Sequence, residues 1–233
     1  MPKAILFDLD DTLLEYESVL DSWRATLSAF ATELPAANID EAVRWIGEYS
    51  DWYWRDPERN RQGRLDMTAA RTAVATAFLR EFRLGDDHLA ARIGFALNAR
   101  REAEVRLYQD AQETLTELHR RGVTLALITN GHSTPQREKI ERFALGAYFA
   151  HVQIEGEFGF GKPDERVYRH VLDRLAVDAA QAWMIGDNLE WDVAGPQRLG
   201  IHGIWFNPLD KSLPVGNATR PDRTIRRLSE LLE

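Results

Sequence analysis

Two aspartates follow directly after the first apolar run of the chain. Residues 4–7 (AILF) have the composition of a buried strand, and Asp8, Leu9 and Asp10 come next. Because side chains alternate along an extended chain, the carboxylates of Asp8 and Asp10 should lie on one side, with Leu9 opposite. Two carboxylates held close together repel each other unless a cation or a shared proton relieves them. The pair therefore favours a site for a hard cation such as Mg²⁺, although a solvated turn also accommodates such residues.

Further short apolar runs predict the strands that must surround this one. They are residues 123–129, 152–154, 183–185 and 203–206. Helical patterns lie between them, at residues 110–121, 136–143, 164–175 and 192–199. Strands that alternate with helices indicate an α/β fold with a Rossmann-like, doubly wound parallel sheet. In such sheets ligands bind outside the carboxyl ends of the strands, which is where Asp8 and Asp10 would lie.

Residues 17–106 break this alternation. They contain no convincing strand but four helical patterns, at 19–34, 40–54, 68–82 and 87–100. We therefore expect an inserted all-helical cap domain at 17–106, and a discontinuous α/β catalytic core made of 1–16 and 107–233. Residues 208–221 are rich in Pro, Gly and Asn and predict a surface loop. A short final helix is expected at 224–232.

Composition excludes several classes of protein. The net charge of −8 argues against a nucleic-acid binder, which needs a basic surface to neutralise phosphates. The absence of cysteine excludes disulfides and zinc–thiolate sites. No run approaches the roughly 18 apolar residues that a membrane helix needs. We expect a cytoplasmic protein that acts on a small molecule, and the sequence does not decide between a monomer and a homodimer.

Four motifs occur in order, each at the end of a predicted strand. They are residues 8–12 (DLDDT), 126–131 (ALITNG), 162–163 (KP) and 186–192 (GDNLEWD). Together they resemble the four motifs of the haloacid dehalogenase-like hydrolase superfamily, and the resemblance covers the whole core. The helical insertion after the first motif is where the subgroup with a helical cap carries it. The resemblance implies a magnesium-dependent phosphatase, similar to the branch that contains nucleotide 5′-phosphatases and sugar-phosphate phosphatases.

The same resemblance assigns roles to individual residues. Asp8 would be the nucleophile that forms an aspartyl-phosphate, and Asp10 would act first as general acid and then as general base. Thr129 would hydrogen-bond the transferring phosphoryl group. Asn130 and Gly131 would help through backbone amides, because the strand end is followed by the start of a helix, where free N–H groups favour an anion.

The two later motifs would complete the site. Lys162 would neutralise charge on Asp8 and on the phosphoryl oxygens. Asp187 would bind Mg²⁺ together with Asp8 and the backbone carbonyl of Asp10. Asp192 would orient Lys162 or a metal-bound water, or it is simply an acidic residue in the first turn of a helix.

The reactions known in the family that this sequence resembles differ in the residues they require, which reduces the number of possible reactions. Dehalogenation does not require a second aspartate in the first motif, so the presence of Asp10 favours phosphate monoesters. Phosphonate cleavage in that family uses a cap lysine, and residues 17–106 contain none. A phosphosugar mutase and a non-catalytic scaffold remain alternatives. The expected substrate is a small phosphorylated metabolite, either a nucleoside monophosphate or a sugar phosphate.

Aromatic residues are concentrated in one part of the predicted cap. They are Trp45, Tyr49, Trp52, Tyr53 and Trp54. Such rings could stack on a nucleobase or a sugar. Trp45, Tyr49 and Trp52 also recur at helical spacing, which is typical of the cap's own core. Both interpretations remain open.

Overall fold

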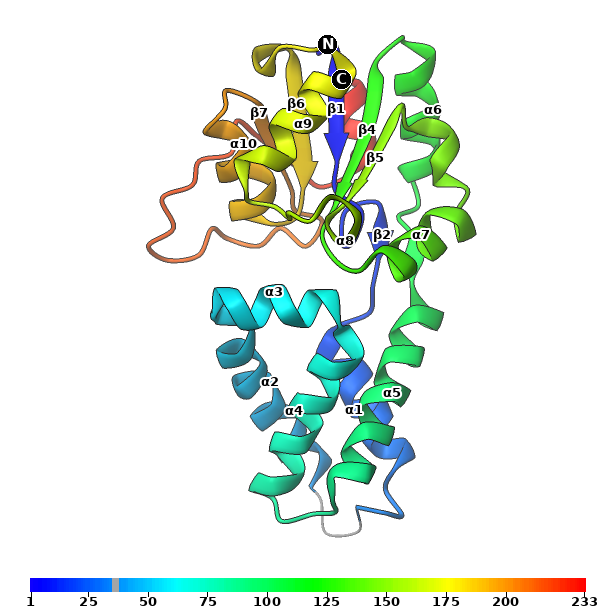
Figure 1. Cartoon of the computed structure of the whole chain (residues 1–233), viewed down its shortest axis with the longest axis vertical. Helices are drawn as coiled ribbons and strands as arrows, with labels where there is room; N and C mark the ends of the chain where they lie inside the picture. Colours follow the sequence, from blue (N-terminus) through cyan, green and yellow to red (C-terminus); the bar gives the residue numbers. More distant parts are fainter. Residues whose placement is uncertain (35–37) are drawn as a thin grey trace. The chain divides into compact units, whose positions relative to one another are not determined.

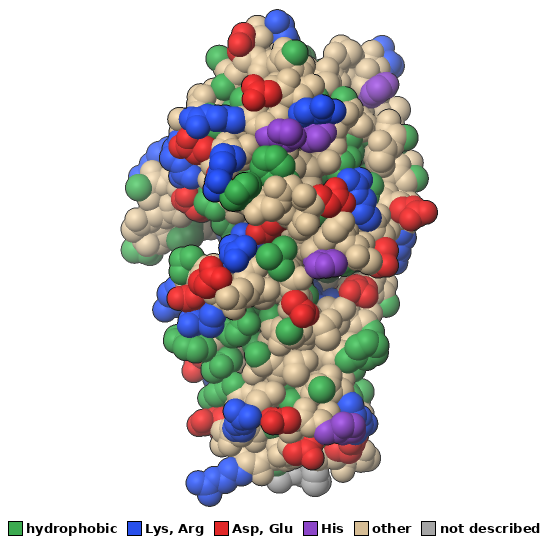
Figure 2. All heavy atoms as spheres, in the orientation of Figure 1, with side chains coloured by type: hydrophobic (Ala, Val, Ile, Leu, Met, Phe, Trp, Pro, Cys, Tyr) green, Lys and Arg blue, Asp and Glu red, His purple; other side chains and the backbone are tan. Residues whose placement is uncertain are grey.

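The computed structural model describes residues 1–34 and 38–233. These residues form two compact units. The core unit contains Met1–Glu15 and Arg106–Glu233, and the helical unit contains Tyr16–Val105. None of the described helices is long and apolar enough to cross a membrane. On the face shown in Figure 2, basic and acidic side chains are interspersed, so neither sign of charge forms a continuous field there.

The core unit is built on a six-stranded sheet in the order β5–β4–β1–β6–β7–β8, and each strand runs parallel to its neighbours (Figure 1). The strands are β1 (Ala4–Phe7), β4 (Thr124–Thr129), β5 (His151–Ile154), β6 (Ala182–Gly186), β7 (His202–Phe206) and β8 (Arg223–Ile225). The predicted α/β fold with a doubly wound parallel sheet is therefore confirmed.

β1 lies in the middle of this sheet, hydrogen-bonded to β4 on one side and to β6 on the other. Its residues are completely buried, as expected for a parallel strand covered on both faces. The chain extends the sheet from β1 in one direction through β4 and β5, and in the other through β6, β7 and β8. The carboxyl end of β1 is therefore at the point where the strand order reverses, and ligands bind in the crevice beside such a point.

Helices connect and cover these strands. In the described part of the core unit they are α6 (Ala111–Arg120), α7 (Ser133–Arg142), α8 (Glu155–Phe158), α9 (Glu165–Leu175) and α10 (Gly195–Gln197). α9, in front of the sheet in Figure 1, is strongly amphipathic. Its buried residues Val167, Tyr168 and Val171 pack in one cluster with Ala126 of β4 and Met184 of β6. This apolar stripe fixes α9 on the sheet.

The predicted final helix at 224–232 is correct only in its second half. The segment begins with β8, and only Leu228–Leu232 form a helical turn, of the tighter 3₁₀ type. Ile225 is completely buried and pairs with Phe206 in the parallel ladder. Pairing with an existing sheet edge thus overrides the weak helical pattern.

The structure also contains a short two-stranded ribbon that the sequence did not predict. β2 (Leu14–Glu15) pairs antiparallel with β3 (Arg106–Leu107), with Leu14 opposite Leu107 and Glu15 opposite Arg106. Strands of two residues are too short to show a period in the sequence. The ribbon lies where the chain leaves the core unit and where it returns.

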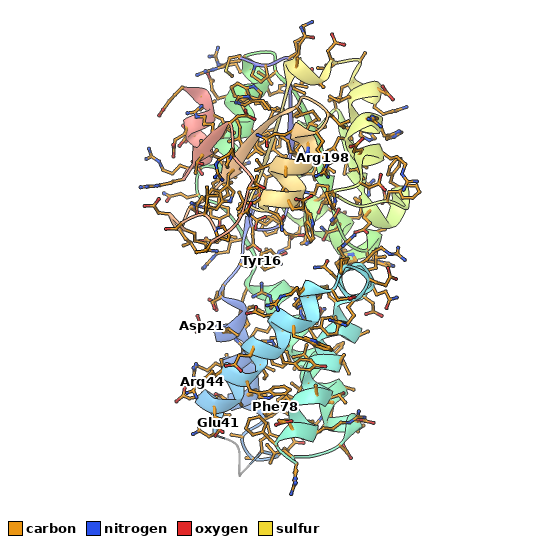
Figure 3. All side chains as sticks on the ribbon, turned by 90° about the vertical axis from the view of Figure 1, so that its left-hand side faces the viewer. Tyr16, Asp21, Glu41, Arg44, Phe78 and Arg198 are labelled. Atoms are coloured by element: carbon orange, nitrogen blue, oxygen red, sulfur yellow. The ribbon has the colours of Figure 1, made fainter. Side chains whose placement is uncertain are left out.

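In the helical unit the described residues form α1 (Val19–Ala29), α2 (Ile39–Arg55), α3 (Pro57–Leu65), α4 (Met67–Glu81) and α5 (Asp87–Glu104). Phe78 is completely buried and lies among these helices in Figure 3, within a core that includes Trp23, Leu27 and Ile93. α3 is absent from the predicted elements. Pro57 suggested a turn there, but proline is favoured in the first turn of a helix.

The aromatic residues of α2 form a stack of rings. Trp45 stacks on Tyr49 with ring centroids 5.0 Å apart, and Tyr49 lies 5.1 Å from Trp52. Trp45 and Tyr49 pack against the core of the helical unit, whereas Trp52 is half exposed beneath the guanidinium group of Arg59. Tyr53 and Trp54 form a separate edge-to-face pair at 5.1 Å. Trp45 and Tyr49 thus belong to the core of the helical unit. That any of the five aromatic side chains contacts substrate stays a prediction.

Candidate active site

Asp8 is the first residue after β1 and is almost completely buried. Its backbone N–H donates to the carbonyl of Ile185 at 2.9 Å, which ties it to β6. Oδ1 accepts a hydrogen bond from Lys162 Nζ at 2.7 Å, and Oδ2 lies 3.4 Å from the hydroxyl of Thr12. Burial raises the pKa of Asp8 although Lys162 opposes the shift. The carboxylate is therefore paired with the charge of Lys162 and also has two neutral donors, the Thr12 hydroxyl and the backbone N–H of Leu9.

Lys162 is completely enclosed, and its ammonium group is shared between two carboxylates. Nζ lies 2.7 Å from Asp8 Oδ1 and 2.6 Å from Asp192 Oδ1. Burial disfavours the charge on Lys162, but Asp192 and Asp8 outweigh burial and raise the pKa of the ammonium group. Asn130 holds the Lys162 backbone from both sides, accepting from its N–H at 2.7 Å and donating to its carbonyl at 2.9 Å. The position of this charge is thus fixed by both side chain and backbone.

Asp192 lies in a π-helical turn, Leu189–Ala194, that follows β6. The predicted helix at 192–199 therefore starts earlier, because the Asn188 side chain accepts from the N–H groups of Glu190 and Trp191. Asp192 is fully buried, and a Cβ at Gly186 would lie 2.2 Å from its carboxyl carbon. Glycine is required there because the carboxyl group packs directly over the backbone.

The Asp192 carboxylate has partners on both oxygens. Oδ1 accepts from Lys162, and Oδ2 accepts from the N–H of Asn188 at 3.1 Å. Burial, only partly opposed by Lys162, raises its pKa to about 7. Asp192 is thus placed to orient Lys162, as the motif resemblance implies.

Asp187 follows β6 and is exposed to solvent. Its backbone is held by Thr12, whose Oγ1 accepts from the Asp187 N–H at 3.2 Å, and by Trp205, whose Nε1 donates to the Asp187 carbonyl at 2.9 Å. Desolvation by the surrounding protein, together with the charges of Asp8 and Asp192, raises the pKa of Asp187 to about 9. Neither Thr12 nor Trp205 was expected to take part in the site.

The carboxylates of Asp8, Asp187 and Asp192 each offer an oxygen within 4.8 Å of the others. Three carboxylates face the single ammonium group of Lys162, and the pKa of each carboxyl group is raised. A divalent cation would relieve this excess of negative charge, and carboxylate oxygens are the ligands that Mg²⁺ prefers. The donor set therefore fits magnesium, with Asp8 and Asp187 as the carboxylates best placed to hold it.

Asp10 is held from α7 by two side chains that the motifs do not single out. Its Oδ2 accepts from Gln136 Nε2 at 2.8 Å, and its Oδ1 lies 2.5 Å from Lys139 Nζ. Gln136 also donates to Thr129 Oγ1 at the buried end of β4. A polar pair three residues apart, just after the second motif, is the only signal of this contact in the sequence.

The loop after β4 is stabilised by a buried carboxylate. Gly131, at φ 116°, donates its N–H to Glu155 Oε2 at 3.0 Å, and Glu155 is 4% exposed. The amide expected to meet the phosphoryl group is therefore engaged by Glu155 in this structure. A Cβ at Gly161 would lie 2.4 Å from Glu155 Cδ, so the loop before Lys162 also packs on this carboxylate. Glu155 was not among the expected site residues.

The chain resembles known proteins in sequence and in fold. Residues 2–200 match the model of the haloacid dehalogenase-like hydrolase family. The chain is 30% identical to a phosphoserine phosphatase from Thermus thermophilus, over 98% of this chain and 97% of that protein. It is 32% identical to a ribulose-1,5-bisphosphate 5-phosphatase from Halopiger xanaduensis, over 100% and 99%. A magnesium-bound crystal structure of the HAD-hydrolase YfnB from Bacillus subtilis shares the fold, with a TM-score of 0.75, 23% identity, and coverage of 99% and 96%.

Proposed function

The chain belongs to the haloacid dehalogenase-like hydrolases, and we propose that it hydrolyses phosphate monoesters of small metabolites through a phosphorylated Asp8. The enzyme class, a phosphoric monoester hydrolase, follows from phosphatase relatives that match over nearly the whole chain. Those relatives act on phosphoserine and on a sugar bisphosphate, so small phosphorylated metabolites are the substrate class that we assign.

One observation carries the assignment of the nucleophile. The buried ammonium group of Lys162 is bonded to one oxygen of Asp8 at 2.7 Å, and the other oxygen lies 3.4 Å from the Thr12 hydroxyl. The ammonium group favours the ionised carboxylate, and it offsets the negative charge that a phosphoryl group brings. Asp192 holds Lys162 in place for both purposes.

The proposed reaction has two steps. An Asp8 oxygen attacks phosphorus, the bond from phosphorus to the leaving oxygen breaks, and Asp10 gives that oxygen a proton, so that an alcohol leaves. Asp10, now ionised, then takes a proton from water as the water oxygen attacks the aspartyl-phosphate. Inorganic phosphate leaves and Asp8 is restored. Thr129 and the backbone N–H of Asn130 would hold the phosphoryl oxygens between the steps, whereas the N–H of Gly131 is bonded to Glu155.

Magnesium is part of this proposal. Asp8, Asp187 and the backbone carbonyl of Asp10 would hold the ion, and it would supply positive charge next to the phosphoryl oxygens. Thr12 and Trp205 hold the backbone of Asp187 and so set the direction of its carboxylate.

The test is phosphate release from a panel of phosphoserine, sugar phosphates, nucleoside monophosphates and p-nitrophenyl phosphate, with and without Mg²⁺. We expect magnesium-dependent release that is abolished in Asp8→Asn and retained in Asp178→Asn, a control at an exposed aspartate outside the site. Release without metal, or full activity of Asp8→Asn, would contradict the proposal. Chromatography of the sugar-phosphate reactions distinguishes hydrolysis from the isomerisation expected of a mutase.

A further inference from the structure

Gln136 makes three polar contacts in the site, although it lies outside the four sequence motifs. It lies in α7, is 4% exposed, and its amide nitrogen contacts Asp10 Oδ2 at 2.8 Å, Thr129 Oγ1, and the carbonyl of Asn130 at 3.0 Å. A carboxylate and a carbonyl only accept hydrogen bonds, so the nitrogen of the Gln136 amide, rather than its oxygen, must face this group. One amide thus joins the loop after β1 to the end of β4.

The second oxygen of Asp10 is held from the same helix. Lys139 lies one turn after Gln136 in α7, and its ammonium group contacts Asp10 Oδ1 at 2.5 Å. Residues three apart share a helix face, so α7 presents both donors to one carboxylate. With donors on both oxygens, the plane of the Asp10 carboxyl group is fixed as well as its position.

The number of hydrogens on the Gln136 amide nitrogen limits how many hydrogen bonds it can donate. Its amide carries two hydrogens but faces three oxygens, so it can make only two strong hydrogen bonds at once. Because Thr129 Oγ1 accepts from Gln136, the hydroxyl hydrogen of Thr129 points away from the amide, and in this structure it donates at 3.3 Å to the carbonyl of Asn130. A phosphoryl oxygen would take the place of that long contact when substrate binds.

We propose that Gln136 is a positioning residue that sets Asp10 and Thr129 in a fixed relation to each other, with Lys139 as the second support of Asp10. Gln136 exchanges no proton itself and acts through the two side chains that it holds. It aligns the group that transfers the proton with the hydroxyl that holds the phosphoryl group. This inference rests on the proposed phosphatase function, because it assigns Asp10 to proton transfer.

The way in which the hydrolysis rate depends on the leaving group distinguishes a positioning role of Gln136 from a merely structural one. An alkoxide is a strong base and needs a proton as it leaves, whereas p-nitrophenolate leaves readily without one. Misplacing Asp10 should therefore slow the hydrolysis of alkyl phosphates more than that of p-nitrophenyl phosphate. A general loosening of the site should slow both substrates by the same factor.

The experiment compares kcat and KM for the best alkyl phosphate of the panel and for p-nitrophenyl phosphate, with Mg²⁺ present. The test variant is Gln136→Met, which keeps the length of the side chain and removes the amide. Gln153→Met is the matched control. Gln153, in β5, is equally buried, at 4% exposure, but its Nε2 bonds the carbonyl of Val167 in α9 at 2.9 Å.

We expect the ratio of kcat for the alkyl phosphate to kcat for p-nitrophenyl phosphate to fall by about 10-fold or more in Gln136→Met. This factor is a part of the rate enhancement that general acid catalysis supplies. The ratio should be unchanged in Gln153→Met. Lys139→Met, at a more exposed position, should shift the ratio in the same direction and keeps the test valid if Gln136→Met fails to fold.

The two proposals fail in different ways. An unchanged ratio in a folded Gln136→Met, or in Lys139→Met if Gln136→Met does not fold, overturns the positioning role while the phosphatase function stands. If the unsubstituted protein releases no phosphate from any substrate, or if Asp8→Asn retains full activity, the proposed function fails and the positioning role fails with it.

Discussion

Lys162 donates a 2.6 Å hydrogen bond to Asp192, and both side chains are closed to solvent, at 1% and 0% exposure. Such a pair is costly to break from one side, because the remaining charge stays buried without its partner. Asp8, the second partner of Lys162, is itself nearly buried. The stability of the core unit and the chemistry of the nucleophile therefore depend on the same ammonium group.

Removing the carboxyl group of Asp192 should destabilise the protein, because Lys162 Nζ and the N–H of Asn188 both lose a buried acceptor. We expect Asp192→Ala to lower the free energy of unfolding by about 3 kcal/mol. Asp87→Ala is the control, because the ion pair of Asp87 with Arg80 is exposed on both sides. The control should cost less than about 1 kcal/mol. Urea unfolding measures both, and equal costs would contradict the expectation.

Stabilisation by magnesium should increase with pH. The pKa of Asp187 is raised to about 9 and that of Asp192 to about 7, from an ordinary value of 3.8. Above the ordinary value the folded protein holds protons that the unfolded chain has released, so without metal the free energy of unfolding falls as pH rises towards 9. Mg²⁺ binds the ionised carboxylates and offsets this loss.

Thermal unfolding with and without Mg²⁺, at about pH 6 and about pH 8.5, tests this sign. The rise in Tm on adding Mg²⁺ should be larger at the higher pH. Asp187→Asn should reduce both the rise and its pH dependence. A rise that is equal at the two pH values, or larger at the lower one, would count against carboxylate ligation by this group.

Thr12 should be required for its hydroxyl rather than for its size. It is completely buried, lies 3.4 Å from Asp8 Oδ2 and accepts from the Asp187 N–H at 3.2 Å. Thr12→Val keeps the shape but loses both contacts, and should weaken Mg²⁺ affinity by about 10-fold, as for other groups that orient metal ligands. Thr12→Ser should retain most of the affinity. Isothermal titration with Mg²⁺ distinguishes them, and equal affinities would show that the hydroxyl does not matter.

Gly186 should tolerate no side chain. A Cβ there would meet the Asp192 carboxyl group at 2.2–2.5 Å, and Asp192 is fully buried. We expect Gly186→Ala to cost about 2 kcal/mol or more of stability, as in other overpacked cores, and to lower phosphate release by displacing Lys162. Gly146→Ala is the control, since its nearest neighbour would be 3.9 Å away. Similar losses in both variants would show that crowding at Asp192 is not the cause.

The parallel sheet and the strand ends could be predicted from the sequence because they depend on local composition. Strands buried on both faces are short apolar runs, and β1 and β4 begin and end within a residue of the predicted limits. Chemistry at the carboxyl ends follows from the topology of such sheets. The structure brings Asp8, Lys162, Asp187 and Asp192 together, as the order of the motifs implies.

The remaining features depend on contacts between distant parts of the chain. Gln136 and Asp10 are 126 residues apart, and nothing near Gln136 in the sequence reveals which carboxylate it faces. β8 forms because an open edge of β7 is available, which no local pattern near Ile225 indicates. Glu155 resembles any acidic residue after a strand until its burial against Gly131 is known.

The β2–β3 ribbon has a further consequence for how this protein can change. The chain leaves the core unit at Glu15 and re-enters it at Arg106, and these two residues are cross-strand partners. The residues between them are therefore an insert between two neighbouring positions of the core unit. The length of this insert does not affect the order of the strands in the sheet. A helical segment of different sequence could be grafted between the same two residues without altering how β1 meets β4 and β6. Exchange of whole inserts is thus open to evolution and to engineering.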